Sequence, residues 1–126
     1  MFSQKFYLCK HCGNMAGLII NKGVPMVCCG EKMTELVPNT TEASVEKHLP
    51  VVTATGDGIT VEVGSVPHPM TEEHNITFVY VETENGGQRK CLTVGEKPAA
   101  AFRFSGDKPI AVYAYCNLHG LWKTEL

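Results

Sequence analysis

A cysteine and a histidine near the C-terminus stand close enough in the sequence to bind one metal ion. Cys116 and His119 are three residues apart, and they follow a run from Ile110 to Tyr115 that has the composition of a β-strand. Asn117 and Gly120 permit a tight turn after such a strand. A thiolate and an imidazole on one turn are typical ligands of a transition metal. Two ligands do not complete a site, so the remaining ligands must come from other parts of the chain.

Three histidines upstream are the candidates for these additional ligands. His48, His68 and His74 each occur in a stretch that we expect to be a strand end or a loop. His68 lies between two prolines, which restrict the backbone and reduce the entropy lost when the side chain is fixed as a ligand. A lone histidine in a β-domain is more often a surface or core residue, but these three and His119 are all the histidines of the predicted second domain. Four imidazoles and one thiolate exceed the four ligands of a tetrahedral zinc site.

Four cysteines near the N-terminus form a second candidate metal site. Cys9 and Cys12 are separated by two residues at a turn that contains glycine, so both sulfurs can point at one metal ion, as in rubredoxin-like knuckles. Cys28 and Cys29 are adjacent in the chain. Because neighbouring side chains of an extended backbone diverge, we expect a distorted tetrahedron. Two disulfides or a plain structural zinc site are the alternatives for the same four residues.

Two other residues with metal-binding side chains are expected to lie outside both sites. His11 occurs inside the first cysteine pair and is predicted to face solvent. Cys91 falls in the middle of a predicted strand, on the face shared with Arg89 and Thr93, and we interpret it as a bystander.

The composition excludes several classes of function. The 126 residues are enough for one ordinary domain, or for a small domain with a metal-dependent appendage. A formal charge of −2 gives no overall attraction to nucleic acid or to a membrane surface. The N-terminus has no apolar signal-peptide segment and no run is long enough to cross a membrane, so we predict a cytoplasmic protein. In that reducing compartment, six cysteines indicate metal or redox chemistry instead of a disulfide framework.

The N-terminal stretch is predicted to be a small domain that depends on its metal. Short strands are expected at Phe6–Leu8 and Met15–Ile20, followed by a turn at 21–23. A segment this short, with so few large apolar groups, cannot fold by burial alone, and a metal held by four thiolates supplies the missing stability. We therefore predict a metal-stabilised domain at residues 1–37 and a polar, proline-containing linker at residues 38–43.

The remaining residues, 44–126, have the pattern of a β-sandwich. Ile59, Val61 and Val63 alternate with polar or small residues, as expected for a half-buried antiparallel strand. Turn signals rich in glycine separate short β-rich runs, with no convincing helix between them. Six such runs predict the sandwich: Val51–Thr55, Ile59–Val63, Ile76–Glu82, Arg89–Val94, Ala100–Phe104 and Ile110–Tyr115.

Five separated motifs together resemble desulfoferrodoxin, the two-iron class of superoxide reductase. They occur in the family's order and cover essentially the whole chain. The motifs are Cys9-x2-Cys12 with Cys28-Cys29, Glu46-Lys47-His48, the segment Gly64-Ser65-Val66-Pro67-His68-Pro69-Met70, His74, and Cys116-Asn117-Leu118-His119-Gly120.

The resemblance implies two Fe ions per chain, in a desulforedoxin-like N-terminal domain and an immunoglobulin-like β-sandwich. The first iron is assigned to the four N-terminal cysteines. In the family the second iron is square-pyramidal and its sixth position is open to superoxide. Its equatorial imidazoles match His48, His68, His74 and His119, and its axial thiolate matches Cys116.

The resemblance also implies roles for two charged residues, and it implies partners. Glu46 and Lys47 match a mobile loop of the family, in which the glutamate can ligate the oxidised iron and the lysine assists the anionic substrate. Without the resemblance, the same two residues would be an ordinary solvated charge pair. The family is typically a homodimer that rubredoxin reduces, in anaerobes or microaerophiles.

Charge favours the same function. Ferrous iron with four neutral imidazoles and one thiolate keeps a single positive charge, which attracts superoxide locally in an acidic protein. The axial thiolate pushes electron density toward the open position, as it does at haem iron. A tetrathiolate iron is negatively charged in both oxidation states, so electrons should run from it to the second iron. The predicted function is therefore the one-electron reduction of superoxide to hydrogen peroxide.

Two functions of other classes fit parts of the sequence. A small iron or blue-copper-like electron-transfer protein would also use a β-sandwich with a cysteine and a histidine near its C-terminus. A blue-copper site usually adds a weak methionine ligand just downstream, and no methionine follows His119. A zinc-stabilised interaction module would explain the four N-terminal cysteines but would leave the histidines and Cys116 unused.

Overall fold

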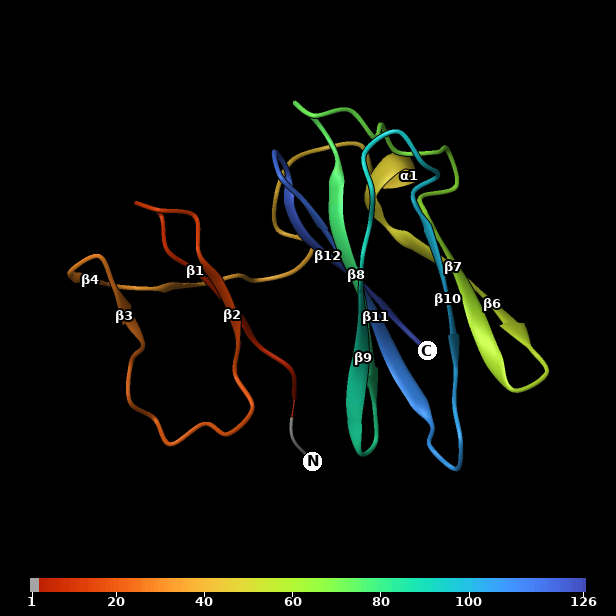
Figure 1. The fold of residues 1–126 in the computed structure, drawn as a ribbon, viewed down its shortest axis with the longest axis horizontal. Helices are drawn as coiled ribbons and strands as arrows, with labels where there is room; N and C mark the ends of the chain where they lie inside the picture. The colour runs from red at the N-terminus through yellow and green to blue at the C-terminus, as the bar shows by residue number, and fades with distance from the viewer. Residues whose placement is uncertain (1–2) are drawn as a thin grey trace. The chain divides into compact units, whose positions relative to one another are not determined.

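The computed structural model describes residues 3–126, which divide into two compact units. The first unit ends at Val37 and the second runs from Pro38 to Leu126. Both are built from antiparallel strands, so the predicted mostly-β fold class is confirmed (Figure 1). None of the helices among residues 3–126 is long and apolar enough to cross a membrane. The predicted linker at residues 38–43 stays a prediction, and within the second unit the Asn39 side chain forms hydrogen bonds with the backbone of Lys123.

The first unit consists of very short strands with almost no core. Its larger sheet has the order β2-β1-β5, and a separate hairpin pairs β3 with β4. Among the described side chains of this unit, only Phe6 and Cys9 are buried. Burial of apolar surface therefore contributes little here, as the composition predicts. The strands are β1 (Phe6–Leu8), β2 (Met15–Gly17), β3 (Val27–Cys28), β4 (Glu31–Lys32) and β5 (Thr34–Glu35).

The second unit is a sandwich of two antiparallel sheets, as predicted. One sheet has the order β10-β7-β6 and the other the order β12-β11-β8-β9. Three strands facing four strands is the architecture of immunoglobulin-like domains. The strands are β6 (Pro50–Thr55), β7 (Gly58–Val63), β8 (Ile76–Thr83), β9 (Gly86–Cys91), β10 (Ala99–Arg103), β11 (Pro109–Cys116) and β12 (Gly120–Glu125).

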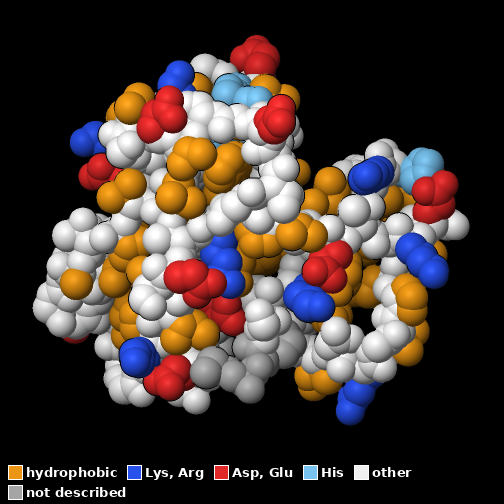
Figure 2. Space-filling model, turned by 180° about the vertical axis from the view of Figure 1, so that it is seen from behind, with side chains coloured by type: hydrophobic (Ala, Val, Ile, Leu, Met, Phe, Trp, Pro, Cys, Tyr) orange, Lys and Arg blue, Asp and Glu red, His pale blue; other side chains and the backbone are white. Residues whose placement is uncertain are grey.

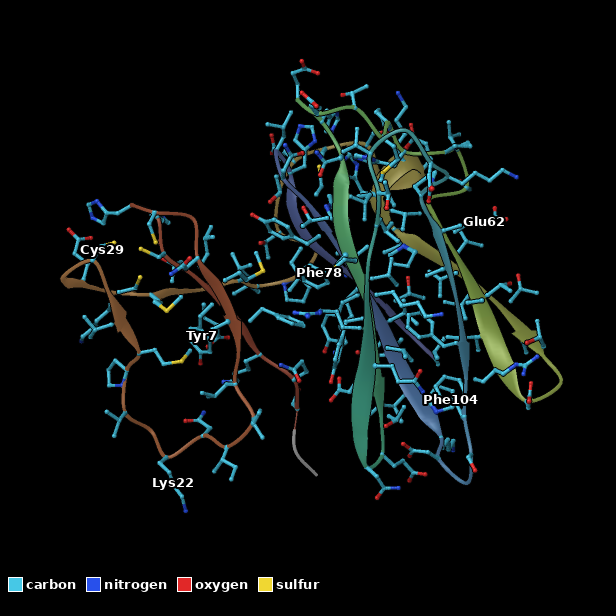
Figure 3. All side chains as sticks on the ribbon, in the orientation of Figure 1. Tyr7, Lys22, Cys29, Glu62, Phe78 and Phe104 are labelled. Atoms are coloured by element: carbon cyan, nitrogen blue, oxygen red, sulfur yellow. The ribbon has the colours of Figure 1, made fainter. Side chains whose placement is uncertain are left out.

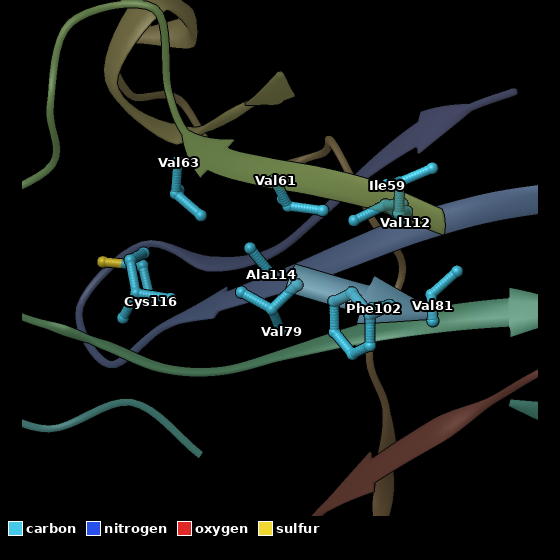
Figure 4. Packing of buried hydrophobic residues seen from close by; sticks show 10 residues of the cluster. Ile59, Val61, Val63, Val79, Val81, Phe102, Val112, Ala114 and Cys116 are labelled. Carbon is cyan, nitrogen blue, oxygen red and sulfur yellow. The ribbon is translucent and has the colours of Figure 1, made fainter. Parts of the chain in front are cut away.

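A single apolar core lies between the two sheets (Figure 4). In β7 the side chains of Ile59, Val61 and Val63 are buried and their neighbours are not, so the predicted alternation is confirmed. They pack against valines of β8 and β11 and against Phe102 of β10. Cys116 is fully buried at the end of this core, at the last position of β11. The core thus fixes the position of the thiol of the predicted metal site.

Several elements differ from the sequence prediction, including the short strands β4 and β5, which were not predicted. The strand predicted at Met15–Ile20 ends at Gly17, and β9 occupies Gly86–Cys91 where Arg89–Val94 was predicted. Cys91 therefore ends a strand and is exposed, instead of lying mid-strand. Strand β12 was not predicted, yet it pairs with β11 along its whole length. A helix of one turn, α1 (Val45–His48), was also not predicted.

The core makes one prediction for stability. Val61 is fully buried, whereas Val51 on the neighbouring strand is 42% exposed. We expect Val61→Ala to lower the free energy of unfolding by roughly 2–3 kcal/mol, because it removes buried methyl groups and leaves a cavity. Val51→Ala is the matched control and should change it by less than about 1 kcal/mol. Urea denaturation followed by the fluorescence of the single tryptophan measures both, and equal losses would contradict this description of the core.

Candidate metal centres

The four N-terminal cysteines come together at one point. The four Sγ atoms all lie within 4.8 Å of one another. The sulfur of Cys28 is 3.6 Å from that of Cys12 and 4.0 Å from that of Cys29. Sulfurs of a tetrahedral site with metal–sulfur bonds of about 2.3 Å lie about 3.8 Å apart, so the set fits one metal ion. All six cysteines are free, which disfavours the alternative of two disulfides.

The backbone around Cys29 explains how two adjacent cysteines face one point. Cys29 has a left-handed backbone, with φ of 53°, and Gly30 follows with φ of 76°. Cys28 ends strand β3, but Cys29 is not in the extended conformation that would turn its side chain away from that of Cys28. Figure 3 shows Cys29 beside the β3–β4 hairpin, with other sulfur atoms near it. His11 is exposed and lies 3.1 Å from a carboxylate oxygen of Glu31, so it is outside the ligand set, as predicted.

Crowding of the four sulfurs makes their acidities unequal. Hydrogen bonding with the sulfurs of Cys12 and Cys9 raises the pKa of Cys28 to about 12. The backbone N–H of Cys12 is the main cause that lowers the pKa of Cys9 to about 6. One thiolate therefore forms readily among thiols, but four thiolates at this distance require a cation.

The second set is a ring of four imidazoles in the sandwich. Neighbouring ring centroids are 4.7 Å apart for His48 and His68, 4.5 Å for His68 and His74, 5.1 Å for His74 and His119, and 4.9 Å for His119 and His48. Across the ring, the centroids of His48 and His74 are 6.3 Å apart. The four histidines thus stand at the corners of a rough square. The structure brings together all the histidines that the sequence singled out in this unit.

The ligand atoms of these residues point at a common centre. Those of His48, His68, His74 and Cys116 lie within 4.8 Å of one another. The Nε2 atom of His48 is 3.2 Å from Nε2 of His68 and 3.1 Å from Nδ1 of His119. Nitrogens bound to one metal at right angles, with bonds of about 2.1 Å, lie about 3.0 Å apart. The Cys116 sulfur is 3.8 Å from Nδ1 of His119, which places the thiol beside the ring of four imidazoles.

Backbone carbonyls fix which nitrogen of two imidazoles faces the centre. The Nδ1–H of His48 donates to the carbonyl of Ser44 at 2.6 Å, and that of His68 donates to the carbonyl of Pro69 at 2.7 Å. Each bond leaves Nε2 without a proton and directed inward. A metal-bound histidine ordinarily donates its other N–H to such an acceptor.

The remaining ligands are held by the turn between β11 and β12. The backbone N–H of His119 donates to the Cys116 sulfur at 3.3 Å. The indole N–H of Trp122 donates to the His119 carbonyl at 3.1 Å, and its ring stacks on His48 at 5.0 Å. Gly120, the residue after His119, has φ of 79°, which a glycine adopts without strain.

Asn117 ties this turn to the segment that carries His74. Its side-chain oxygen accepts from the N–H of Asn75 at 2.9 Å, and its side-chain nitrogen donates to the carbonyl of Glu73 at 2.9 Å. The sequence indicated Asn117 only as a turn residue. Trp122 and Ser44 were missed, because a stacking ring and a carbonyl acceptor leave no spacing pattern.

Burial favours the neutral form of three of the imidazoles. It is the main cause that lowers the pKa of His48 and His74, and it lowers the pKa of His68 to about 4. It also raises the pKa of Cys116, against the backbone N–H groups of Leu118 and His119. The Nε2 atom of His74 is buried and has no hydrogen-bond partner among the described residues. Neutral imidazoles, one unpartnered nitrogen and a thiol that needs a cation to ionise all fit a bound metal.

Glu46 and Lys47 lie on α1, immediately before His48 in the ring. Both side chains are exposed, and they occupy a helical turn instead of the predicted loop. Burial is the main cause that lowers the pKa of His74, and the positive charge of Lys47 lowers it further, so the ammonium acts on an imidazole of the ring. The hydroxyl of Ser44 is the first of several causes that lower the pKa of Glu46.

The chain belongs to the desulfoferrodoxin family. Residues 40–125 match the family model described as desulfoferrodoxin. The chain is 44% identical over 119 residues to a desulfoferrodoxin of Syntrophotalea carbinolica, with 94% of each chain covered. It is 41% identical over 121 residues to that of Nitratidesulfovibrio vulgaris, covering 96% of this chain and 95% of the relative. The predicted resemblance is thus confirmed.

Solved structures agree with this assignment. The crystal structure of the superoxide reductase from Treponema pallidum matches with a TM-score of 0.84 and 34% identity, over 98% of this chain and 100% of that one. A one-iron superoxide reductase from Giardia intestinalis covers 64% of this chain, with a TM-score of 0.54 and 33% identity. Together with the two ligand sets, family membership confirms the prediction of two iron sites per chain.

The two sites should bind metal independently, because each has a complete ligand set within its own unit. We expect Cys12→Ser to reduce the iron content from two ions per chain to one, with the remaining ion in the histidine site. Cys91→Ser is the matched control, since Cys91 is exposed and outside both ligand sets, and it should keep both ions. Elemental analysis and electronic spectra of the purified proteins decide the outcome, and loss of both ions in Cys12→Ser would contradict independence.

Proposed function

We propose that this chain is a superoxide reductase. Superoxide takes up one electron and two protons and becomes hydrogen peroxide. The observation that carries the proposal is the square of four imidazoles with the Cys116 thiol beside it. The predicted class is an oxidoreductase that acts on superoxide. It agrees with the relatives from Pyrococcus horikoshii and Treponema pallidum, which are named superoxide reductases.

The burial of the ligands supports one direction of approach for the substrate. Cys116 is fully buried in the core, and His48 and His68 are each 2% exposed. His74 and His119 are half-buried, and Lys47, whose charge acts on His74, is exposed. Histidine side chains reach the surface at one end of the sandwich, with acidic and basic side chains near them (Figure 2). Superoxide therefore reaches the ring from the side away from Cys116.

Each residue has a defined part in this reaction. The four imidazoles and the Cys116 thiolate would hold a ferrous ion, which would supply the electron that reduces superoxide. Cys116 would add electron density to that ion from the buried side, as thiolate ligands do at haem iron. Lys47 attracts the anion and orders a water that can give a proton. Glu46, on the same helical turn, supplies a carboxylate to the oxidised site, as the family resemblance implies.

The main alternative is an electron-transfer protein without catalysis. A blue-copper site uses two histidines, one cysteine and a weak axial ligand. The four imidazoles here exceed that set, which favours the reductase. A zinc module is disfavoured because it gives the second ligand set no role. Rubredoxin as the electron donor and the homodimer stay predictions from the family resemblance, and the cytoplasmic location stays a prediction from the sequence.

Product stoichiometry tests the proposed function directly. The iron-loaded, pre-reduced protein is mixed with superoxide under anaerobic conditions, and peroxide and dioxygen are measured. Reduction yields one peroxide for each superoxide consumed and no dioxygen. Release of dioxygen in equal amount with peroxide would identify a dismutase, and no reaction with superoxide would favour the electron-transfer alternative.

Lys47 should accelerate capture of the anion. Its ammonium adds a positive charge beside the ring in a protein whose formal charge is −2. We expect Lys47→Ile to slow the second-order reaction with superoxide roughly ten-fold without loss of iron. This factor already includes the weakening of the charge attraction by solvent screening. The rate should also fall with ionic strength in the wild type, and fall less in the variant.

A lysine at the opposite end of the sandwich provides the control for this variant. Lys108→Ile makes the same change in net charge, in the turn between β10 and β11. Stopped-flow or pulse-radiolysis rates should be near normal for Lys108→Ile. If both variants slowed equally, the effect would come from net charge and Lys47 would have no specific part.

Cys116 should be needed for turnover but not for the fold of the strands. Its thiolate is the only anionic ligand in the proposed set, and its side chain ends the apolar core. We expect Cys116→Ser to lower turnover at least ten-fold and to weaken iron binding at this site, because serine is a poor anion at neutral pH. The four-cysteine iron is an internal reference for metal content. Normal turnover in this variant would contradict the axial role of Cys116.

A further inference from the structure

The helical turn α1 has little stability of its own. It comprises four residues, Val45–His48, and Ser44 at its N-terminus makes no side-chain capping bond. A helix this short does not persist in isolation. Because α1 carries both Lys47 and His48, the site depends on whatever holds this turn in place.

Pro50 frees a carbonyl of α1 for bonding outside the helix. In a continuing helix, the Glu46 carbonyl would accept from the N–H of residue 50, and proline has none. The oxygen instead accepts from the backbone N–H of Val66 at 2.9 Å and from the Ser65 hydroxyl at 3.2 Å. The segment that follows β7 is therefore bonded to the turn at the atom that the helix does not use.

Gly64 permits this close approach because it has no side chain. A Cβ atom there would lie 2.3 Å from the carbonyl oxygen of Glu46 and 2.7 Å from the carbonyl carbon of Lys47. Both are backbone atoms, so neither can rotate away as a flexible side chain would. Gly64 is not among the glycines with a left-handed backbone, so space is the reason for glycine at this position.

We propose that Gly64, Ser65 and Val66 form a clamp that positions α1, and with it Lys47 and His48. We call these three residues the α1 clamp. The same segment leads to His68, whose N–H donates to the Val63 carbonyl at 2.9 Å. One short segment therefore sets two imidazoles of the ring and the lysine beside it. The part that concerns Lys47 rests on the proposed function, whereas the part that concerns His48 rests on the metal site alone.

Insertion of one methyl group tests the steric part of the clamp. We expect Gly64→Ala to push α1 away and to lower the iron content of the histidine site at least ten-fold, while the four-cysteine iron stays. Gly56→Ala is the matched control, because a Cβ atom at Gly56, in the turn between β6 and β7, has no neighbour within 4 Å. Full iron content in both variants, with unchanged spectra, would overturn the steric part.

A second variant keeps the clamp testable even if Gly64→Ala does not fold. Ser65→Ala removes only the hydroxyl that donates to Glu46. The Leu49 amide, bonded to the Val45 carbonyl at 2.9 Å, reports on opening of α1. In the iron-loaded protein we expect its hydrogen exchange to be roughly five-fold faster in Ser65→Ala, the effect of one hydrogen bond. Ser65→Thr keeps a hydroxyl and should exchange the Leu49 amide as slowly as the wild type. Ser105→Ala, in the β10–β11 turn, should also leave the exchange of this amide unchanged. Unchanged Leu49 exchange in Ser65→Ala would overturn the clamp.

The reaction with superoxide separates positioning from mere stabilisation. We expect Ser65→Ala to slow the second-order rate about three-fold and to weaken its dependence on ionic strength, because a less confined Lys47 attracts the anion less effectively. Faster exchange with an unchanged rate and salt dependence would overturn the positioning of Lys47. If the wild type itself did not react with superoxide, the proposed function would fail, and the exchange and iron measurements would still decide the clamp.

Discussion

Desolvation of one thiol and the imidazoles around it is the constraint on which the second site depends. Burial lowers the pKa of His68 to about 4 and raises that of Cys116, so without a cation the imidazoles stay neutral and the thiol resists ionisation. The buried Nε2 of His74 has no hydrogen-bond partner among the described residues. Each of these groups is costly to bury alone. A metal ion removes all three costs together, because it takes the nitrogen lone pairs and stabilises the thiolate. Metal binding at this end of the sandwich therefore contributes directly to its stability.

The two units use opposite physical means to hold a metal. In the sandwich, an apolar core lies between two sheets, and Cys116 is its last member. The histidines are supplied by α1, by the segment between β7 and β8, and by the β11–β12 turn, and the carbonyls of Ser44 and Pro69 orient two of them. The first unit buries only two described side chains, one of which is the ligand Cys9. There the metal takes the place of a core, and the left-handed backbone of Cys29 serves the sulfur geometry.

Sequence periodicity and ligand spacing were sufficient for part of this structure. The alternation in β7 is strong because its outward side chains are polar. The spacing of Cys116 and His119 places both ligands at one turn, whichever register the preceding strand adopts. Strand β12 was not predicted: its first residue, Gly120, was interpreted as part of the metal-binding turn, and the residues after it were assigned to no element. The displacement of β9 has a similar local cause. A Cβ atom at Gly87 would lie 2.0 Å from the hydroxyl of Tyr80, so this glycine belongs to a close strand pair and not to the predicted turn. The helix α1 could not be predicted, since a single turn held by tertiary bonds has no periodicity to detect.

The helical turn α1 restricts movement of the backbone near the ring of imidazoles. The family resemblance implied a mobile loop at Glu46 and Lys47, but the backbone here is bonded at the Glu46 carbonyl by two donors. Both side chains nevertheless remain exposed, and each has several rotatable bonds. Movement of these side chains needs no opening of α1, whereas movement of the backbone would break both bonds and displace His48. On the proposed function, a fixed backbone with exposed side chains would let Lys47 follow an approaching anion without disturbing the neighbouring imidazole of His48. The Glu46 carbonyl oxygen, which Pro50 leaves without a helical donor, accepts from Ser65 and Val66 and so holds the backbone of both residues in place.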